Sequence, residues 1–394
     1  MRALTWQGKR DVRVETVPDP EIVDATDIIV RITSTGICGS DLHLYEVLGP
    51  FLDPGDILGH EPMGIVEEAG AKVTEVAVGD RVVVPFNISC GTCWMCRQGL
   101  QSQCETTQVT DRGMGAALFG FSKLYGQVPG GQAELLRVPF GNTLPVKVAH
   151  GPPDQRFVYL SDVLPTAWQS VAYAGIPPGG SVTVLGLGPI GDMAARIALH
   201  RGAAKVFGVD LVPERLARAR ARGVHTLDLN VYGKGVDDEI RRLTEGRGSD
   251  AVIEAVGMEA HGAALSRAAQ NLAGRLPDAL GEKVMGHAGV DSMAAFNTAV
   301  DAVRRGGTIS LIGVYGGSVD PVPMRTLFDK QIQLRMGQAN VKHWVDVILP
   351  LLNDEDVLGV DDFATHTLPL EQGPQAYQSL QEKRDGMIKT ILTP

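Results

Sequence analysis

The chain of 394 residues is poor in cysteine, with five in all, and has no apolar run of the roughly 18 residues that indicate a transmembrane helix. Basic residues number 36 against 46 acidic ones, and the net charge of −10 argues against nucleic-acid and anionic-membrane partners. No like-charged block, internal repeat or low-complexity segment stands out. The N-terminus lacks the apolar core of a signal peptide, so we expect a soluble cytoplasmic protein.

Four of the five cysteines lie close together, at Cys90, Cys93, Cys96 and Cys104. Two-residue gaps suit metal chelation, and four thiolates would close a tetrahedral zinc site without an open position for chemistry. The alternative is a pair of disulfides, which an oxidising compartment would favour. The spacing therefore predicts a structural zinc site.

The fifth cysteine, Cys38, lies upstream of the sequence Gly59-His60-Glu61. Mixed ligation by cysteine, histidine and carboxylate, with one position left open, is typical of catalytic zinc. Cys38 and His60 are therefore candidate ligands of a second zinc ion. The alternative for His60 is an ordinary buried histidine.

The pattern of apolar and polar residues changes near residue 165. Before it, short β-branched runs at 28–32, 64–68 and 81–84 are broken by Gly, Pro and Asp, which predicts a β-rich region. After it, apolar strands alternate with Ala/Arg-rich helical stretches, which predicts βαβ units and a parallel sheet. The expected parallel strands lie at 183–185, 206–209, 251–253 and 308–312, and a final strand is expected at 387–392.

The first parallel strand runs into a glycine-rich turn that carries a dinucleotide-binding pattern, followed by a helical stretch. Its members are Gly186, Gly188, Pro189, Ile190 and Gly191. The glycines would permit the tight turn, the approach of backbone to pyrophosphate and the packing of helix on sheet.

Asp210, 24 residues after Gly186, would bind the adenosine ribose hydroxyls and repel a 2′-phosphate, which favours NAD over NADP. Arg215 keeps NADP open, since its guanidinium could reach a phosphate. The alternative for the whole pattern is a plain glycine-rich turn beside a surface aspartate.

Taken together, these motifs and their order resemble those of the zinc-dependent medium-chain alcohol dehydrogenases, over essentially the whole chain. The sequence Leu160-Ser161-Asp162-Val163-Leu164-Pro165-Thr166 most resembles the branch of glutathione-independent formaldehyde dehydrogenases and formaldehyde dismutases. The resemblance implies a GroES-like β-rich catalytic domain at 1–163 and 338–394, and a Rossmann domain, a doubly wound parallel sheet, at 164–337.

The resemblance implies catalytic zinc on Cys38, His60 and Asp162. Glu61 would be a neighbour of the metal or an alternate ligand. Because Ser161-Asp162 precedes an apolar run, Asp162 could instead be a helix N-cap.

Further roles also follow from the resemblance. Ser40 and His43 would relay the proton, Thr166 would pack on the nicotinamide, and Lys389 would lie near the pyrophosphate. The alternative for Ser40 and His43 is a helix cap and a surface histidine. Two stretches run longer than the family usually needs: 106–153, and an insertion at 261–291 that either shields NAD or is a surface excursion.

The sequence therefore predicts a zinc- and NAD-dependent oxidoreductase that interconverts a small alcohol, or an aldehyde hydrate, and its carbonyl product. The first alternative is an aldehyde dismutase, acting on formaldehyde for example, that retains its NAD. The second is a zinc- and nucleotide-binding regulatory protein without turnover. A nucleic-acid-binding zinc module is disfavoured, because Arg97 is the only cation near the cysteine cluster. We expect a homodimer or homotetramer.

Overall fold

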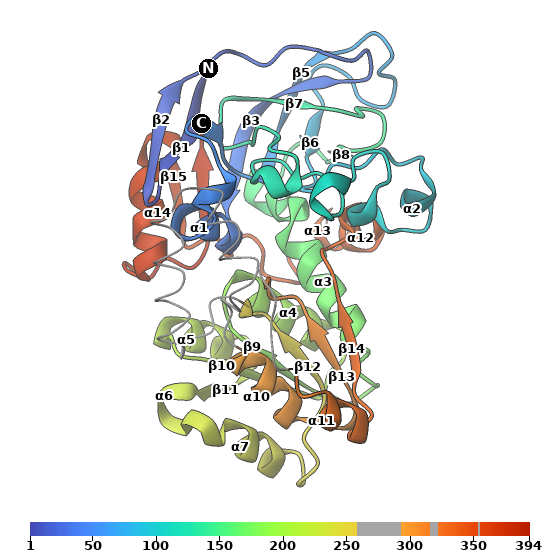
Figure 1. The fold of residues 1–394 in the computed structure, drawn as a ribbon, viewed down its shortest axis with the longest axis vertical. Helices are drawn as coiled ribbons and strands as arrows, with labels where there is room; N and C mark the ends of the chain where they lie inside the picture. The colour runs from blue at the N-terminus through green and yellow to red at the C-terminus, as the bar shows by residue number, and fades with distance from the viewer. Residues whose placement is uncertain (258–292, 316–321, 354) are drawn as a thin grey trace. The chain divides into compact units, whose positions relative to one another are not determined.

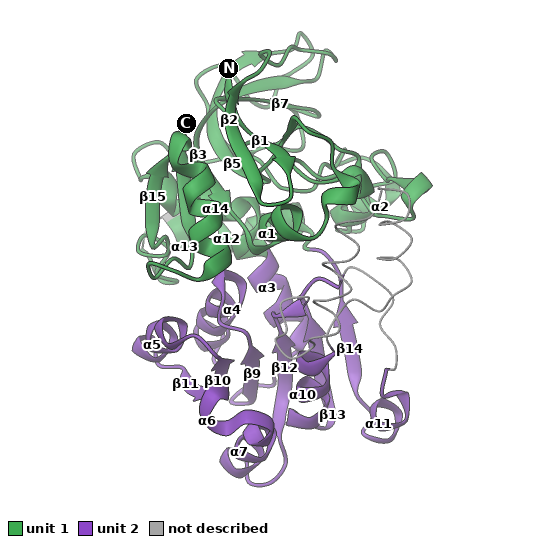
Figure 2. Cartoon of the chain, turned by 60° about the vertical axis from the view of Figure 1, so that its left-hand side comes forward, with its two compact units in different colours: residues 1–165, 339–394 green, residues 166–338 purple. Residues whose placement is uncertain are grey.

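The structure is a computed structural model that describes residues 1–257, 293–315, 322–353 and 355–394. The insertion at 261–291 lies outside the described residues. The chain divides into two compact units (Figure 2): unit 1 comprises residues 1–165 and 339–394, and unit 2 comprises residues 166–338. The sequence expectation drew these boundaries after residues 163 and 337.

Unit 1 is built on β-structure, as its β-branched runs predict. Its larger sheet has the order β15-β16-β3-β5-β6-β8, with β7 also paired to β3 (Figure 1). These strands are β3 (Ile28–Ile37), β5 (Glu61–Ala69), β6 (Arg81–Val83), β7 (Leu135–Val138), β8 (Val146–Lys147), β15 (His366–Pro369) and β16 (Thr390–Thr393). A smaller sheet has the order β2-β1-β4, formed by β1 (Arg2–Gly8), β2 (Asp11–Thr16) and β4 (Asp56–Ile57).

Apolar side chains from this larger sheet form the core of unit 1. Ile28, Val30 and Ile32 alternate along β3 and pack with Val66 of β5 and Phe119. The period of two residues puts these side chains on one face of the strand. The helices of the unit are α1 (Gly39–Glu46), α2 (Trp94–Arg97), α12 (Val341–Ile348), α13 (Pro350–Asn353) and α14 (Gly373–Glu382).

Unit 2 is a six-stranded parallel sheet with the order β11-β10-β9-β12-β13-β14, which is the doubly wound order with β9 at the point where the winding reverses. The strands are β9 (Ser181–Leu185), β10 (Lys205–Asp210), β11 (His225–Asp228), β12 (Ser249–Glu254), β13 (Val303–Leu311) and β14 (Gln333–Met336). Helix α3 (Val163–Ala174) leads from unit 1 into this sheet. The helices between its strands are α4 (Pro189–His200), α5 (Pro213–Ala221), α6 (Leu229–Tyr232), α7 (Val236–Leu243), α10 (Ala294–Ala302) and α11 (Met324–Asp329). Strand β9 is buried throughout, as expected for a parallel strand covered on both faces.

The expected last strand was partly wrong. Residues 387–389 are not in the sheet, and β16 begins at Thr390. The backbone N–H groups of Ile388 and Lys389 donate to Thr365 Oγ1 instead of to a neighbouring strand. A side-chain hydroxyl therefore replaces the ladder at this point.

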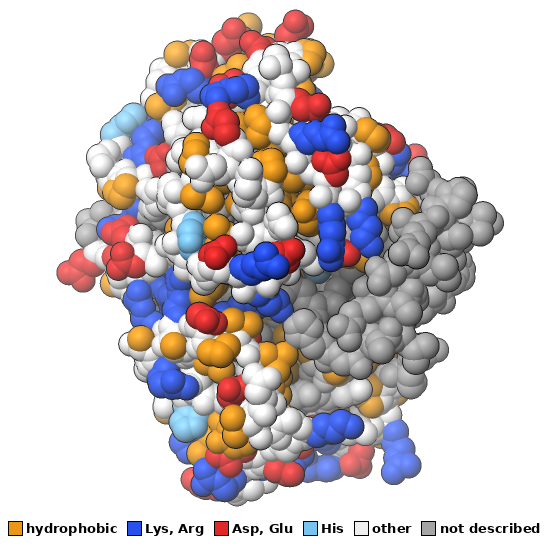
Figure 3. Space-filling model, turned by 90° about the vertical axis from the view of Figure 1, so that its left-hand side faces the viewer, with side chains coloured by type: hydrophobic (Ala, Val, Ile, Leu, Met, Phe, Trp, Pro, Cys, Tyr) orange, Lys and Arg blue, Asp and Glu red, His pale blue; other side chains and the backbone are white. Residues whose placement is uncertain are grey.

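Two global observations bear on partners. Among the described residues, no helix is both long and apolar enough to cross a membrane. On the face shown in Figure 3, acidic and basic side chains are interspersed, and no broad basic surface of the kind that follows a phosphate backbone is visible there.

Candidate metal centres and nucleotide loop

The four-cysteine cluster forms as the spacing predicts. One sulfur atom from each of Cys90, Cys93, Cys96 and Cys104 lies within 4.8 Å of the others. All four thiols are free, and Cys93 Sγ is 3.9 Å from Cys104 Sγ, well beyond the roughly 2.05 Å of a disulfide bond. The geometry thus favours a metal over paired disulfides.

Local donors prepare this cluster for a cation. Burial opposes ionisation of Cys90, but hydrogen bonds from the Thr106 hydroxyl, the Thr92 amide and hydroxyl, and the Cys93 amide outweigh it and lower the pKa of Cys90 to about 5. The Cys90 amide in turn donates to Cys104 Sγ at 3.3 Å. Burial and then the Cys93 side chain raise the pKa of Cys96, so local donors favour the zinc-binding thiolate at only part of the cluster, and the four converging sulfurs are what fit a closed structural site.

The second cluster gathers Cys38, His60, Glu61 and Asp162, each with one ligand atom within 4.8 Å of the others. Cys38 comes directly after β3 and caps α1, while Glu61 is the first residue of β5 and His60 directly precedes it. The register of β3 against β5, which pairs Gly36 with Glu61, brings these segments together. All four residues belong to unit 1.

Asp162 completes this cluster from a different segment. It lies between the 3₁₀ helix η6 (Val158–Ser161) and α3, and its Oδ2 is 3.6 Å from Cys38 Sγ and 3.5 Å from His60 Nε2. A position directly before α3 also suits a helix cap, so the placement alone satisfies both interpretations. A helix cap alone would not need to lie close to two other candidate ligands, so this proximity favours a ligand role for Asp162.

The charges of the cluster show how well a cation fits. Burial, together with the charge of Asp162, raises the pKa of the Cys38 thiol. Burial also raises the pKa of Glu61, whose Oε1 is buried without a hydrogen-bond partner. Lys389 pairs with Glu61, while the half-buried Cys38 thiol and the Asp162 carboxyl group converge beside them, and a divalent cation would stabilise the charged forms of both.

Asp41 was missed by the sequence reasoning. Fully buried on α1, it places Oδ1 3.0 Å from His60 Nδ1, while its Oδ2 accepts the Cys38 amide at 2.9 Å. The two atoms are in ion-pair contact without the geometry of a hydrogen bond, and Nε2 faces the cluster. Burial disfavours the charged ring, but Asp41 and then Asp162 outweigh it and raise the pKa of His60. The signal was the acidic residue three positions after the cap, where a capping-box partner stands.

Two aromatic rings contact the imidazole. Phe86 and Phe121 lie edge-on to His60, with ring centroids 6.2 Å and 6.4 Å away, and Tyr125 packs against Phe121 at 5.6 Å. Phe121 and Tyr125 come from the long stretch 106–153, so part of this extra length borders the cluster.

Of the two expected proton-relay residues, Ser40 lies at the cluster. Its Oγ is 3.3 Å from His60 Nε2, and the cap of α1 is Cys38, so Ser40 is not the helix cap. His43 is half-buried one turn further along α1. Thr166 is half-buried in α3, at the start of unit 2.

Lys389 lies beside Glu61 in unit 1. We expected it beside the cofactor pyrophosphate, but its side chain is fully buried in unit 1, forms an ion pair with Glu61 and donates to Ile37 O at 3.0 Å. The register that pairs Thr390 of β16 with Ile37 of β3 places it there. Its expected place near the cofactor pyrophosphate stays a prediction.

The glycine-rich turn joins β9 to α4 in unit 2, and its glycines differ in role. Gly186 has a φ of +83°, which side-chain-bearing residues rarely adopt, and a Cβ on Gly191 would lie 1.8 Å from Gly186 O. A Cβ on Gly188 would meet nothing nearer than Arg215 Nη1 at 3.7 Å, so the space beside Gly188 is open. Pro189 and Ile190 begin α4, whose N-terminal N–H groups suit a phosphate.

Asp210 ends β10 beside this turn. Its carboxylate accepts hydrogen bonds from the amides of Leu187 at 2.7 Å, Leu211 at 2.7 Å and Val212 at 2.9 Å. Arg215 Nη1 lies 3.7 Å from Asp210 Oδ2. The structure thus brings both expected ribose-site residues to the turn.

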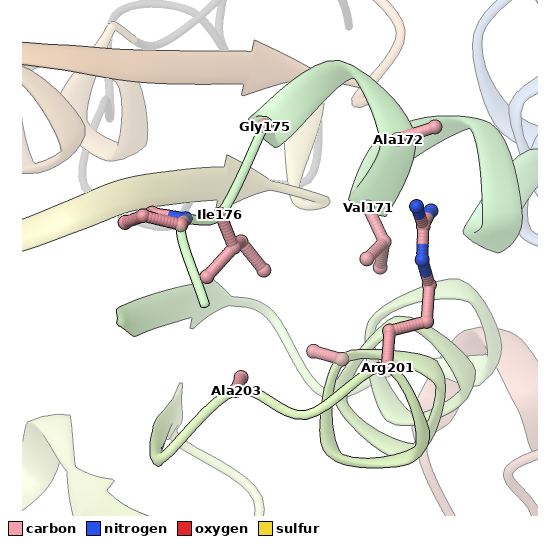
Figure 4. A pocket seen from close by; sticks show the side chains of 8 residues that line it. Val171, Ala172, Gly175, Ile176, Arg201 and Ala203 are labelled. Carbon is pink, nitrogen blue, oxygen red and sulfur yellow. The ribbon is translucent and has the colours of Figure 1, made fainter. Parts of the chain in front are cut away.

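A separate pocket in unit 2 contains none of the predicted site residues. Figure 4 shows Val171 and Arg201 on facing segments, and Arg201 also lies over the Trp168 ring, 5.4 Å from its centroid. The lining is otherwise small and apolar, so the pocket offers no reactive group.

Fold and donor clusters together define a zinc-binding dehydrogenase with two domains. The model of the alcohol dehydrogenase GroES-like domain matches residues 24–148, and that of the zinc-binding dehydrogenase domain matches residues 189–276. The chain belongs to the zinc-dependent medium-chain alcohol dehydrogenase family and is an oxidoreductase of the zinc-type alcohol dehydrogenase kind.

Its relatives match it from end to end. A zinc-type alcohol dehydrogenase-like protein of Bacillus subtilis is 39% identical over 401 residues and covers 100% of both chains. Formaldehyde dismutase of Pseudomonas putida is 33% identical, covering 95% of this chain and 94% of its own. Among solved structures, alcohol dehydrogenase TADH from Thermus sp. ATN1 has a TM-score of 0.81 at 32% identity, covering 100% of this chain and 99% of that one.

Proposed function

We propose that the protein transfers hydride between NAD and a small alcohol or aldehyde, with zinc held by Cys38, His60 and Asp162. The observation that carries this proposal is the convergence of these three donors beside Glu61, with His60 and Asp162 buried and Cys38 half-buried. Oxidation of the alcohol gives its carbonyl, the hydride reduces NAD and one proton is released. When bound, zinc would polarise the substrate oxygen as a Lewis acid.

The chain's own residues would handle the proton and the ring. Ser40 Oγ, at the cluster, would accept the substrate hydroxyl proton while releasing its own proton toward His43 on the same helix, and His43 would pass that proton to solvent. Thr166 would pack on the nicotinamide. Glu61 would stay on Lys389, close enough to reach the metal.

NAD is the proposed cofactor because Asp210 is held by three backbone donors. A carboxylate fixed in this way cannot turn from a 2′-phosphate, and its negative charge would repel one. Arg215 lies near Asp210, so the positive charge of Arg215 is partly balanced by that carboxylate and would attract a 2′-phosphate less.

A second candidate is an aldehyde dismutase, which would reduce one aldehyde while oxidising another on the same retained NAD. Similarity to formaldehyde dismutase over 95% of the chain supports it. A substrate panel of alcohols and aldehydes separates the two. Release of reduced nicotinamide into solution on added NAD supports a dehydrogenase, whereas paired alcohol and acid without such release supports a dismutase. A regulatory protein would give neither.

Asp162→Asn tests the ligand set. As a ligand, Asp162 is needed for the catalytic zinc, so the variant should lose that ion and most activity while keeping the four-cysteine zinc. If Asp162 is only a helix cap, Asp162→Asn should lower the free energy of unfolding by under roughly 1 kcal/mol and leave turnover ordinary. Asp162→Cys should partly restore metal binding, because a thiolate also ligates zinc. Ordinary activity and two zinc ions in Asp162→Asn would make Glu61 the leading third ligand.

A further inference from the structure

A chain of buried polar groups lies behind His60. Tyr377 OH on α14 donates to Gln132 Oε1 at 2.8 Å, and Gln132 Nε2 donates to Asp41 Oδ2 at 3.3 Å. Asp41 Oδ1 in turn faces His60 Nδ1 at 3.0 Å. Tyr377, Gln132 and Asp41 are all completely buried. Burial removes these groups from bulk water, so Tyr377, Gln132 and Asp41 depend on the hydrogen bonds between them, while Asp41 meets His60 through an ion-pair contact.

The orientation of the Gln132 amide follows from its neighbours. Its nitrogen also donates to Gly36 O at 3.1 Å, so it lies between a carbonyl and a carboxylate, both of which only accept. Its oxygen faces the phenol hydroxyl, which can donate. Asp41 Oδ2 therefore takes two donors, Gln132 and the Cys38 amide, and Oδ1 is left for His60.

Gln132 also contacts the backbone on the His60 side. Its backbone N–H donates to Leu58 O at 3.0 Å, and a Cβ on Gly59 would lie 2.3 Å from Gln132 Cγ. Gly59 has a φ of +95°, and the side chain of Gln132 fills the space beside it. One residue thus touches the segments that lead into both Cys38 and His60.

We propose that Gln132, oriented by Tyr377, is a positioning residue that holds Cys38 and His60 in the arrangement a metal needs. It acts on Cys38 through Gly36 and Asp41, and on His60 through Asp41 and Gly59. This inference rests on the proposed function, in that Cys38 and His60 must be metal ligands. Partners behind the ligands of a metal site typically account for about 10- to 100-fold in metal affinity.

The experiment compares metal release from the full-length parent protein, Gln132→Met, Tyr377→Phe and a control. Gln132→Met keeps length and removes both polar groups. Tyr377→Phe keeps the ring and leaves Gln132 Oε1 without a donor. Tyr45→Phe is the matched control, since Tyr45 packs against Tyr377 with ring centroids 5.5 Å apart and lies outside the hydrogen-bonded chain. Zinc-loaded proteins are mixed with a chelator and the released zinc is followed over time, alongside thermal unfolding.

In the parent and Tyr45→Phe we expect one fast and one slow zinc. Gln132→Met should release the fast zinc about tenfold sooner or more, with the slow, four-cysteine zinc unchanged. Tyr377→Phe should accelerate the same zinc to a smaller degree. Because Tyr377 acts through Gln132, the double variant should release it no faster than Gln132→Met alone.

Parent-like release of the fast zinc from Gln132→Met, with two zincs present, would overturn this inference alone. The same holds if both zincs leave faster in step with a lower unfolding temperature, since that marks a general loss of stability. If Gln132→Met does not fold, Tyr377→Phe decides, and release equal to Tyr45→Phe overturns the inference. A parent that holds only the four-cysteine zinc would overturn the proposed function as well.

Discussion

Gly191→Ala is the sharpest perturbation of the nucleotide loop. Gly191 lies in the first turn of α4, and an added Cβ would stand 1.8 Å from Gly186 O, against the 3.4 Å at which ordinary contact begins. The deficit of about 1.6 Å cannot be relieved by a rotamer change, because the obstacle is backbone. Either the turn or the start of α4 must move.

The size of the effect follows from this displacement. Overpacking of a buried site typically costs about 1–3 kcal/mol, and the backbone obstacle places this variant at the upper end. For a unit of this size, a cost of about 3 kcal/mol should lower the unfolding midpoint by roughly 6–12 °C. Misplacing a positioned group by about 1 Å can cost on the order of 100-fold, and we expect that order of loss in NAD binding.

Thermal unfolding and calorimetric NAD titration would measure both effects. Gly235→Ala is the matched control, since Gly235 has a φ of −91° and an added Cβ would meet no atom within 4 Å. Alanine at this N-cap of α7 should cost no more than about 1 kcal/mol and leave NAD binding unchanged. Gly188→Ala should fold normally, because its Cβ has room, yet bind NAD weakly, because that room is where the pyrophosphate would lie. If Gly191→Ala matches Gly235→Ala in both assays, the reasoning about this turn is refuted.

Three further predictions concern the cofactor, the metal ions and the oligomer. With Asp210 intact, kcat/KM for NAD should exceed kcat/KM for NADP at least roughly tenfold, about 1.4 kcal/mol. Asp210→Ser should reduce this ratio by raising kcat/KM for NADP, and equal use of both cofactors by the unmodified protein would show that Arg215 outweighs Asp210. Metal analysis should find two zinc ions per chain, with Cys93→Ser costing folding yield and Cys38→Ser costing turnover; one ion or none in active protein contradicts this. All four residues of β14 are exposed, and β13 is its only partner among the described strands, so Met336→Glu should lower the mass of a homo-oligomer in light scattering, and an unchanged oligomer would exclude this edge.

Much of the site could be predicted because its signals are local. The spacing of Cys90, Cys93, Cys96 and Cys104 brings four sulfurs together within one short segment, and the glycine turn needs only the strand before it and the helix after it. The family and its two-domain fold were likewise predicted from motifs and from the change of pattern near residue 165, and the comparisons confirm both.

Contacts between distant segments were decided by the tertiary structure alone. Lys389 meets Glu61 because β16 pairs with β3 in a register that no periodicity in the sequence specifies. The facing of Asp41 on His60, and the reach of Gln132 to Tyr377, likewise depend on how separate elements pack. Residue type and spacing therefore determined which chemistry this chain can perform, whereas strand register and burial determined which side chains support it, because a buried polar group takes its partner from whatever the fold places beside it.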